Sequence, residues 1–218
     1  MITEQRAILP ELLDHADPAI ARESLRDLVR LNRLFGGHRI LKQIMAEFAG
    51  PSDRFTMLDI GAASGDMGAA LRDRYPHARI TSLDYRDDHL AQAGAPKLVG
   101  DAFQLPFPHK SFDFVFSSLF LHHFTNQQVV QLLSGFRAVA GRAVLAIDLD
   151  RGPFAYHFVP ATRWLFGWHA VTLHDAPISV GAGFKRAELL QLAHQAGLGN
   201  ARVRIHRPWA RLSLAAPV

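Results

Sequence analysis

Cysteine is absent from all 218 residues of the sequence. This absence excludes disulfide bonds, thiolate zinc sites, cysteine-held iron–sulfur clusters and catalysis by a cysteine nucleophile. The sequence also lacks a run of about 18 apolar residues, which argues against a membrane-spanning helix. Residues 1–6 lack the basic and apolar pattern of a signal peptide. We therefore expect a cytoplasmic protein.

A strong excess of one charge is missing as well, because 24 basic and 20 acidic residues leave a net charge of only +4. Four arginines gather near the C-terminus, but they are spaced as on a strand: Arg202, Arg204, Arg207 and Arg211. A solvated strand face explains this spacing better than a nucleic-acid surface, which needs a concentrated basic patch. We expect no nucleic-acid partner.

The content of 49% hydrophobic and 20% charged residues is enough for a packed core, and the length suits one α/β domain with an extension. Residues 1–50 are expected to form that extension, since apolar residues recur at helical spacing from 19 to 48 around a break at Gly36-Gly37. Residues 51–218 are expected to form the main domain, with a lid inserted at about 151–184.

Short apolar runs in the main domain alternate with helical patterns. The runs are Thr56–Ile60, Arg79–Asp84, Lys97–Asp101, Phe112–Leu119, Arg142–Leu149, Ala201–His206 and Ala210–Leu214. Helices are expected at 67–75, 87–93 and 185–196, and after a capping box at Thr125–Gln128. This order predicts an α/β, Rossmann-like three-layer sandwich with a mostly parallel seven-stranded sheet and an antiparallel C-terminal edge.

Residues 152–168 are rich in aromatic side chains. Such a stretch suits a lid over a flat or apolar substrate, and it suits equally a satellite core against the N-terminal helices. Contact with a membrane surface is a further alternative, although the stretch has no lysine-rich polar face. Both main interpretations stay open at this point.

The turn after the first strand, Asp59-Ile-Gly-Ala-Ala-Ser-Gly-Asp66, consists mainly of small residues and leads into a helix. Ligands of open α/β sheets bind at such strand ends, where small residues allow close approach of the backbone. A dinucleotide fingerprint would place glycines where Gly61, Ala63 and Asp66 stand. Since Asp66 has the wrong sign for a pyrophosphate, a cationic ligand fits this turn better.

Two more acids stand at the ends of the next strands. Asp84 follows Gly61 by the interval at which a carboxylate accepts both ribose hydroxyls, and Asp101 could accept from an adenine amino group. A single strand-end aspartate is usually a cap or turn residue. Three of them at consecutive strand ends indicate one shared ligand.

These motifs resemble those of class I S-adenosylmethionine-dependent methyltransferases, in the small-molecule subgroup that includes quinone-biosynthesis enzymes. The matching segments are 58–65, 82–84, 100–107 and 111–124, within about residues 55–150. The resemblance implies S-adenosylmethionine as cofactor and S-adenosylhomocysteine as product. It implies cofactor contacts by Asp59, Gly61, Ala63 and Gly65 near methionine, Asp84 and Tyr85 near ribose, Asp101, Ala102 and Phe103 near adenine, and Ser117 or Ser118 beside methionine.

The sequence departs from the family pattern at Ala63, where glycine is frequent, and at Lys185, where a serine or threonine cap is frequent. A methyl group fits at position 63 if the turn residue keeps a negative φ, so we expect a slightly altered loop. Substitution of the helix cap at Lys185 affects stability more than chemistry.

Candidate catalytic residues follow the fourth and fifth strands. His122 is the preferred base, His123 stands beside it, and Asp148 is an alternative base or substrate contact, as is Asp150. No metal site is expected, because the histidines are scattered and the two aspartates alternate across a strand.

The sequence thus predicts methyl transfer to a small molecule, with a hydroxyl of an aromatic, quinone or polyketide-like acceptor preferred, as in secondary metabolism. Carbon methylation of a quinone precursor and non-catalytic S-adenosylmethionine binding are alternatives. A nicotinamide-dependent oxidoreductase is opposed by Ala63 and Asp66. A homodimer is left open, and membrane insertion is not expected.

Overall fold

The fold is built on one seven-stranded sheet. A computed structural model describes residues 5–218. The strands are β1 (Thr56–Ile60), β2 (Arg79–Asp84), β3 (Lys97–Val99), β4 (Phe112–Ser118), β5 (Ala140–Leu149), β6 (Arg202–His206) and β7 (Arg211–Pro217), in the order β3-β2-β1-β4-β5-β7-β6. The first five strands are parallel, and β7 runs antiparallel between β5 and β6. The predicted mostly parallel sheet with an antiparallel C-terminal edge is confirmed.

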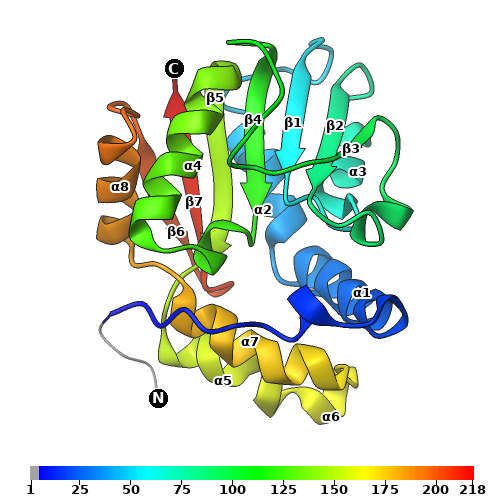
Figure 1. The fold of residues 1–218 in the computed structure, drawn as a ribbon. Coiled ribbons are helices and arrows are strands. Elements are labelled where there is room, and N and C mark those ends of the chain that lie inside the picture. Colours follow the sequence, from blue (N-terminus) through cyan, green and yellow to red (C-terminus); the bar gives the residue numbers. More distant parts are fainter. Residues whose placement is uncertain (1–4) are drawn as a thin grey trace.

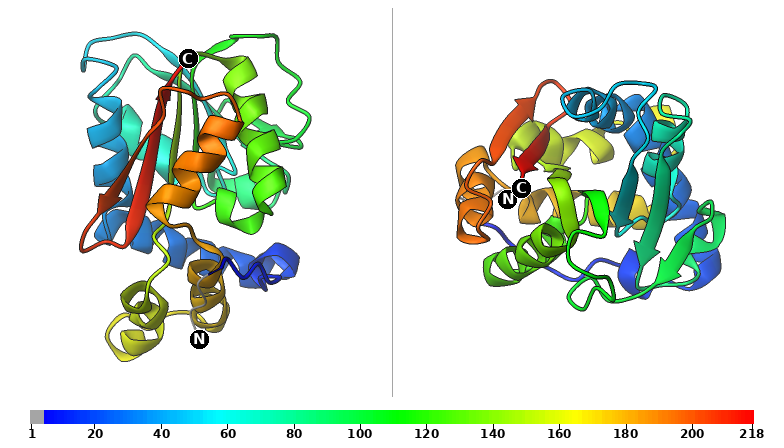
Figure 2. Two further views of the ribbon diagram at one scale, coloured as in Figure 1. Left: turned by 90° about the vertical axis from the view of Figure 1, so that its left-hand side faces the viewer. Right: turned by 90° about the horizontal axis from the view of Figure 1, so that it is seen from above.

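Helices cover both faces of the sheet and its lower edge (Figure 1). On one face lie α4 (Asn126–Val139) and α8 (Arg186–Gln195), and on the other lie α2 (Gly37–Met45) and α3 (Asp66–Arg72) (Figure 2). Beyond the carboxyl ends of the parallel strands lie α1 (Pro18–Leu34), α5 (Pro153–Ala161), α6 (Arg163–Phe166) and α7 (Ala170–Ala182). The short 3-10 helices are η1 (Leu13–His15), η2 (His89–Gln92) and η3 (Leu121–His123). No helix among residues 5–218 is long and apolar enough to span a membrane.

Several boundaries differ from those expected. The helix expected at 87–93 is only the single turn η2, and the third strand ends at Val99 rather than Asp101. The region expected as a lid, 151–184, folds into α5, α6 and α7. Residues 1–4 of the expected N-terminal extension lie outside the described residues. The capping box before α4 is confirmed, because Thr125 and Gln128 bond reciprocally across the helix start.

The sheet is buried on both faces, as a parallel sheet with crossover helices requires. On the α4 and α8 side, Val115 and Val144 pack against Phe136. On the α2 and α3 side, Phe114 and Leu145 join a second apolar cluster. With both faces closed by apolar packing, polar functional groups collect at the carboxyl edge of the strands.

The order of the strands reverses at the β1–β4 boundary. The chain leaves β1 toward β2 and β3, and it later leaves β4 toward β5 and β7. Loops that part in opposite directions open a crevice at this point, and ligands of open α/β sheets bind there. The layer formed by α1, α5 and α7 lies over this crevice.

Arg151 ties the end of β5 to α8. Its fully buried guanidinium lies 2.7 Å from Glu188 Oε1, and it also donates to the carbonyl of Gly183. Glu188 Oε2 accepts from the Lys185 amide, so a carboxylate from the first turn supplies the cap at this helix start. The start of α8 is therefore capped, although Lys185 stands where the family often has serine or threonine.

We expect Glu188→Ala to lower the free energy of unfolding by about 2–3 kcal/mol, because it leaves a buried cation without its carboxylate. The matched control is Glu23→Ala, which removes the exposed pair with Arg26 and should cost at most about 0.5 kcal/mol. Urea denaturation of both variants measures the difference. Equally small losses of unfolding free energy in the two variants would mean that the buried Arg151–Glu188 pair does not stabilise the fold.

Candidate active site

A cavity of about 890 Å³ lies at the carboxyl edge of the sheet. Its walls come from the N-terminal segment, α1, the loops after β1 to β4, the helices α5 and α7, and the start of β7. The side of the cavity nearest α1 and α5 is apolar and includes Leu28, Phe35 and Phe158. The polar groups described below cluster at the strand ends. The cavity therefore offers both a polar end and an apolar wall.

The loop after β1 approaches the cavity through its backbone. Gly61 has a φ of 66°, and a Cβ built there would lie 2.3 Å from Phe120 Cδ2. Only glycine fits this position, so the loop can present its main chain closely to a ligand. Ala63 also has a positive φ, 46°, which corrects our expectation of a negative value. The Ala63 amide donates to Asp84 Oδ2 over 3.0 Å, and this bond helps to hold the turn in place.

The strand-end acids differ in accessibility. Asp84 lines the cavity and also accepts from the Arg86 amide, while Asp101 lines it from an exposed position and accepts from the Phe103 amide. Asp59 lies behind the loop, buried, with Oδ2 lacking a hydrogen-bond partner among the described residues. Burial, followed by the charges of Asp66 and Asp84, raises the pKa of Asp59 well above its ordinary value. Asp59 thus supports the loop rather than lining the cavity.

The structure brings most of the sequence-predicted site residues to one cavity. Those that line it are Gly61, Ala63, Asp84, Tyr85, Asp101, Ala102, Phe103, Ser118, His122 and His123. Asp59, Gly65, Ser117 and Asp148 do not line it, nor does Asp150. Ser118 Oγ is buried and has no partner among residues 5–218, so it is a free donor at the cavity wall.

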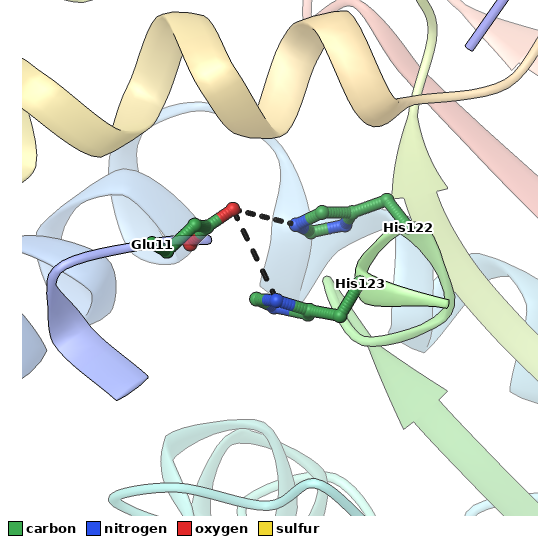
Figure 3. Close-up of side chains that lie close together, drawn as sticks. All are labelled: Glu11, His122 and His123. Carbon is green, nitrogen blue, oxygen red and sulfur yellow. Dashed lines mark ion pairs between the residues drawn. The ribbon is translucent and has the colours of Figure 1, made fainter. Parts of the chain in front are cut away.

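A compact polar cluster stands at the end of β4 (Figure 3). Glu11 Oε1 lies 3.6 Å from His122 Nε2 and 4.0 Å from His123 Nδ1, and both imidazoles point toward it. Behind His122, Asp148 Oδ1 lies 2.7 Å from Nδ1. The two imidazole rings stack at 4.4 Å. His122 therefore sits between two carboxylates, while His123 also lies 3.8 Å from Asp14.

The cluster separates the pKa values of the two histidines. Burial alone would lower the pKa of His122, but the charges and hydrogen bonds of Asp148 and Glu11 outweigh burial and raise it to about 10. Burial lowers the pKa of His123, and the neighbouring charge of His122 lowers it further. At neutral pH His122 is an imidazolium and His123 is a neutral imidazole.

Glu11 is a site residue that the sequence analysis missed. It belongs to the N-terminal segment, where no motif marks it, and it reaches the cavity because this segment is tied down elsewhere. Arg6 donates to the carbonyls of Ala182 and His122, and Asp175 accepts from the Leu12 amide. Ser179 donates to Glu11 Oε1 over 2.5 Å. These long-range contacts leave no local signal in the sequence.

Arg211 corrects another expectation. Arg202 and Arg204 lie exposed and pair with Glu47, as a solvated strand face requires. Arg211 instead is buried and lines the cavity. Only Arg202 and Arg204 alternate on one strand, because Arg207 lies in the turn after β6 and Arg211 begins β7.

The aromatic stretch forms part of the cavity wall and also packs against the N-terminal helices. Phe154 and Phe158 of α5 line the cavity, and the Phe158 ring packs edge-on against Phe35 at the end of α1, with centroids 4.8 Å apart. A cavity wall and a satellite core against the N-terminal helices are therefore the same structure. Whether α5 opens as a lid stays a prediction.

A model of the methyltransferase domain matches residues 58–150. Residues 58–150 therefore resemble a methyltransferase domain. The ubiquinone/menaquinone biosynthesis C-methyltransferase of Paracoccus denitrificans is 31% identical over 151 residues, which cover 62% of this chain and 58% of that protein. The corresponding enzyme of Dinoroseobacter shibae is 33% identical over 96 residues, which cover 38% of each chain. The chain thus spans less than two thirds of the length of these curated relatives.

Solved methyltransferases share the fold of this domain. The plantazolicin methyltransferase BpumL, in complex with S-adenosylhomocysteine, superposes with a TM-score of 0.68 at 14% identity and covers 94% of this chain and 93% of its own. A methyltransferase from Aquifex aeolicus gives a TM-score of 0.57 at 16% identity, over 93% and 99%. The match of residues 58–150 is to a methyltransferase domain, and these solved neighbours share the fold of the chain.

Among residues 5–218, one group of side chains has a spacing that a metal ion could use. The ligand atoms of Glu11, His122 and His123 lie within 4.8 Å of one another. A tetrahedral zinc ion needs such atoms about 3.4 Å apart and a neutral imidazole, whereas His122 is paired as a cation. The spacing and the charge suit an ion-paired cluster.

We expect EDTA to leave both the thermal midpoint and the methyl-transfer rate unchanged, because the cluster is already satisfied by its own charges. Differential scanning fluorimetry and turnover with and without the chelator measure this. Loss of activity that Zn²⁺ or Mn²⁺ restores would instead assign a metal to the cluster.

Proposed function

We propose that this protein transfers a methyl group from S-adenosylmethionine to a flat, apolar small molecule of the aromatic or quinone type. The observation that carries the proposal is a single cavity in which strand-end acids meet a charged two-histidine cluster and an apolar wall. The match of residues 58–150 to the methyltransferase domain supports the same reaction. We further propose that the protein acts without nucleic acid.

The residues at the strand ends fit the cofactor. S-adenosylmethionine, when bound, supplies an electrophilic methyl group on a sulfonium. Asp84 retains lone pairs for ribose hydroxyls although each of its oxygens accepts one backbone amide. Asp101, Ala102 and Phe103 would border the adenine, and the backbone at Gly61 with Ser118 would border the methionine moiety. Negative charge along this wall favours a cationic ligand.

The two histidines would have different roles in acid–base catalysis. Environments that push two pKa values apart identify the acid and the base. His123, neutral and lining the cavity, would remove the hydroxyl proton of the acceptor. His122, held as a cation between Asp148 and Glu11, would stabilise the resulting oxyanion through its positive charge. This assignment reverses the sequence-based preference for His122 as the base. Asp148 acts through His122 as a positioning residue.

Removal of the hydroxyl proton serves either acceptor atom. A phenolate is nucleophilic at oxygen and at the adjacent ring carbon, so S-adenosylmethionine, when bound, would supply its methyl group to either atom. For a carbon acceptor, the ring proton is then lost to a base. The names of the curated relatives, quinone-pathway C-methyltransferases, favour carbon. We therefore propose C-methylation of a quinone precursor ahead of the hydroxyl preferred from the sequence.

Calorimetric titration with S-adenosylmethionine and S-adenosylhomocysteine tests the proposal first. Binding of both, followed by methyl transfer to a phenol or hydroquinone, supports it. Binding without transfer to any such acceptor favours the non-catalytic alternative. Binding of neither by a folded sample refutes it.

We expect Asp84→Asn to weaken S-adenosylhomocysteine binding by roughly ten- to a hundredfold, because an amide cannot accept charge-assisted bonds from both ribose hydroxyls. The amide keeps one acceptor for the loop, so folding should survive. Asp73→Asn, at the distant end of α3, is the matched control. Calorimetry of both variants gives the comparison, and unchanged affinity in Asp84→Asn would remove the ribose assignment.

We expect kcat/KM to rise with pH along an acid limb below pH 6.5 and to fall near pH 10. The base His123 has a pKa lowered from 6.5 and must be neutral, while His122 must remain protonated up to its pKa of about 10. His123→Gln should slow turnover by about a hundredfold and abolish the acid limb, with S-adenosylhomocysteine binding retained. An acid limb that persists in His123→Gln would show that another group is the base.

A further inference from the structure

Arg211 is a buried cation without a counter-ion. Only 4% of the residue is exposed, and its Nε donates a hydrogen bond to the carbonyl of Phe35 over 3.2 Å. Nη1 is buried and has no partner, and no carboxylate of residues 5–218 forms an ion pair with this guanidinium. The other fully buried arginine, Arg151, lies 2.7 Å from Glu188. Arg211 thus differs from Arg151 in being buried without a carboxylate partner, and this difference needs a physical reason.

The position of Arg211 provides that reason, because the residue lines the cavity. It opens β7 and pairs in register with Leu149 at the end of β5. In the order β3-β2-β1-β4-β5-β7-β6, β7 stands four strands from β2, which ends at Asp84. Four steps of about 4.8 Å place the Arg211 strand position about 19 Å from that of Asp84. The cation therefore comes from the side of the cavity opposite to the proposed ribose site.

The surroundings leave Arg211 charged and under-solvated. Trp209 and Phe35 lie on its side of the cavity, and Gly36 admits the Trp209 ring so closely that a Cβ there would lie 2.7 Å from it. Burial lowers the pKa of Arg211 to about 10, although the charges of Asp148 and Asp66, which form no ion pair with it, act in the opposite direction; the guanidinium is still protonated at neutral pH. The planar guanidinium fork matches a carboxylate, with two parallel N–H···O bonds. A buried charge of this kind is stabilised when a ligand supplies the missing anion.

We propose that Arg211 is a subsite for a carboxylate carried by a ligand of this cavity. This inference rests on the proposed function only for the identity of the ligands. Two of them can bring the carboxylate: the methionine part of the cofactor, or an acidic aromatic acceptor. The guanidinium would bind either carboxylate in the same way. The two sources are distinguished by which ligand binds more weakly when Arg211 is replaced.

The experiment compares Arg211→Met with the parent by calorimetry. The probes are S-adenosylhomocysteine, which has the carboxylate, and 5′-methylthioadenosine, which lacks the whole amino-acid part. A third probe is 4-hydroxybenzoate, titrated with S-adenosylhomocysteine already bound. Arg207→Met, an exposed arginine of the preceding turn, is the matched control. Arg211→Lys retains the charge but not the planar fork and should recover only part of the affinity.

If the cofactor supplies the carboxylate, Arg211→Met binds S-adenosylhomocysteine roughly ten- to a hundredfold more weakly and 5′-methylthioadenosine as the parent does. If the acceptor supplies it, only 4-hydroxybenzoate loses affinity. Either result supports the subsite. Parent-like affinity for all three probes in a folded Arg211→Met overturns it. Failure of the parent to bind either nucleoside would instead count against the proposed function.

The thermal midpoint of the ligand-free protein separates a binding role from a structural one. A guanidinium retained only to hold the Phe35 carbonyl would lower the midpoint when replaced. A guanidinium awaiting an anion leaves the midpoint of Arg211→Met equal to or above that of the parent, because a buried unpaired charge is removed. A lower midpoint together with unchanged binding would assign Arg211 to the fold alone.

Discussion

A parallel sheet that is buried on both faces has one place for polar chemistry, the carboxyl edge of its strands. Apolar clusters fill the two faces of this sheet, and the strand order reverses between β1 and β4. The acids of β2 and β3, the histidines after β4 and the arginine of β7 all meet the cavity at that edge. The helices α1, α5 and α7 can then cover the edge without disturbing the sheet. The placement of the site follows from how the sheet is packed.

The buried charges around η3 determine the protonation states of the two histidines at this edge. His122 between Asp148 and Glu11 forms a row in which each charge neighbours an opposite one, so burial costs less than it would for isolated ions. Burial raises the pKa of Glu11, but the hydrogen bond and the charge of His122, together with the hydroxyl of Ser179, outweigh burial and lower it. His123, stacked on that cation, is driven toward its neutral form. The buried ion row thus leaves His123 as the neutral imidazole of the pair, which the proposed role as a base requires.

Local patterns in the sequence were enough for the sheet and for several residues that line the cavity. Asp84 and Asp101 were recognisable because strand ends of one parallel sheet meet at one edge, whatever the details of packing. Glu11 was not, because its place depends on Arg6 and Asp175 tying distant segments together. Ala63 was mispredicted in φ because the bond from its amide to Asp84 is a tertiary contact. Residues placed by tertiary bonds leave no periodicity to detect.

The distribution of charge along the cavity argues for a ligand that carries charges of both signs. Acidic side chains, Asp84, Asp101, Asp14 and Glu11, line the walls contributed by the strand ends and the N-terminal segment, whereas Arg211 stands alone on β7. A purely cationic ligand would leave that arginine unpaired, and a purely anionic one would be repelled by the acids. A zwitterion with its cationic part near the acids and its carboxylate toward β7 would satisfy both. Methionine joined to a nucleoside through a sulfonium has these charges, and S-adenosylmethionine together with an acidic acceptor would supply them as well, so either source of the carboxylate proposed for Arg211 agrees with the acidic wall.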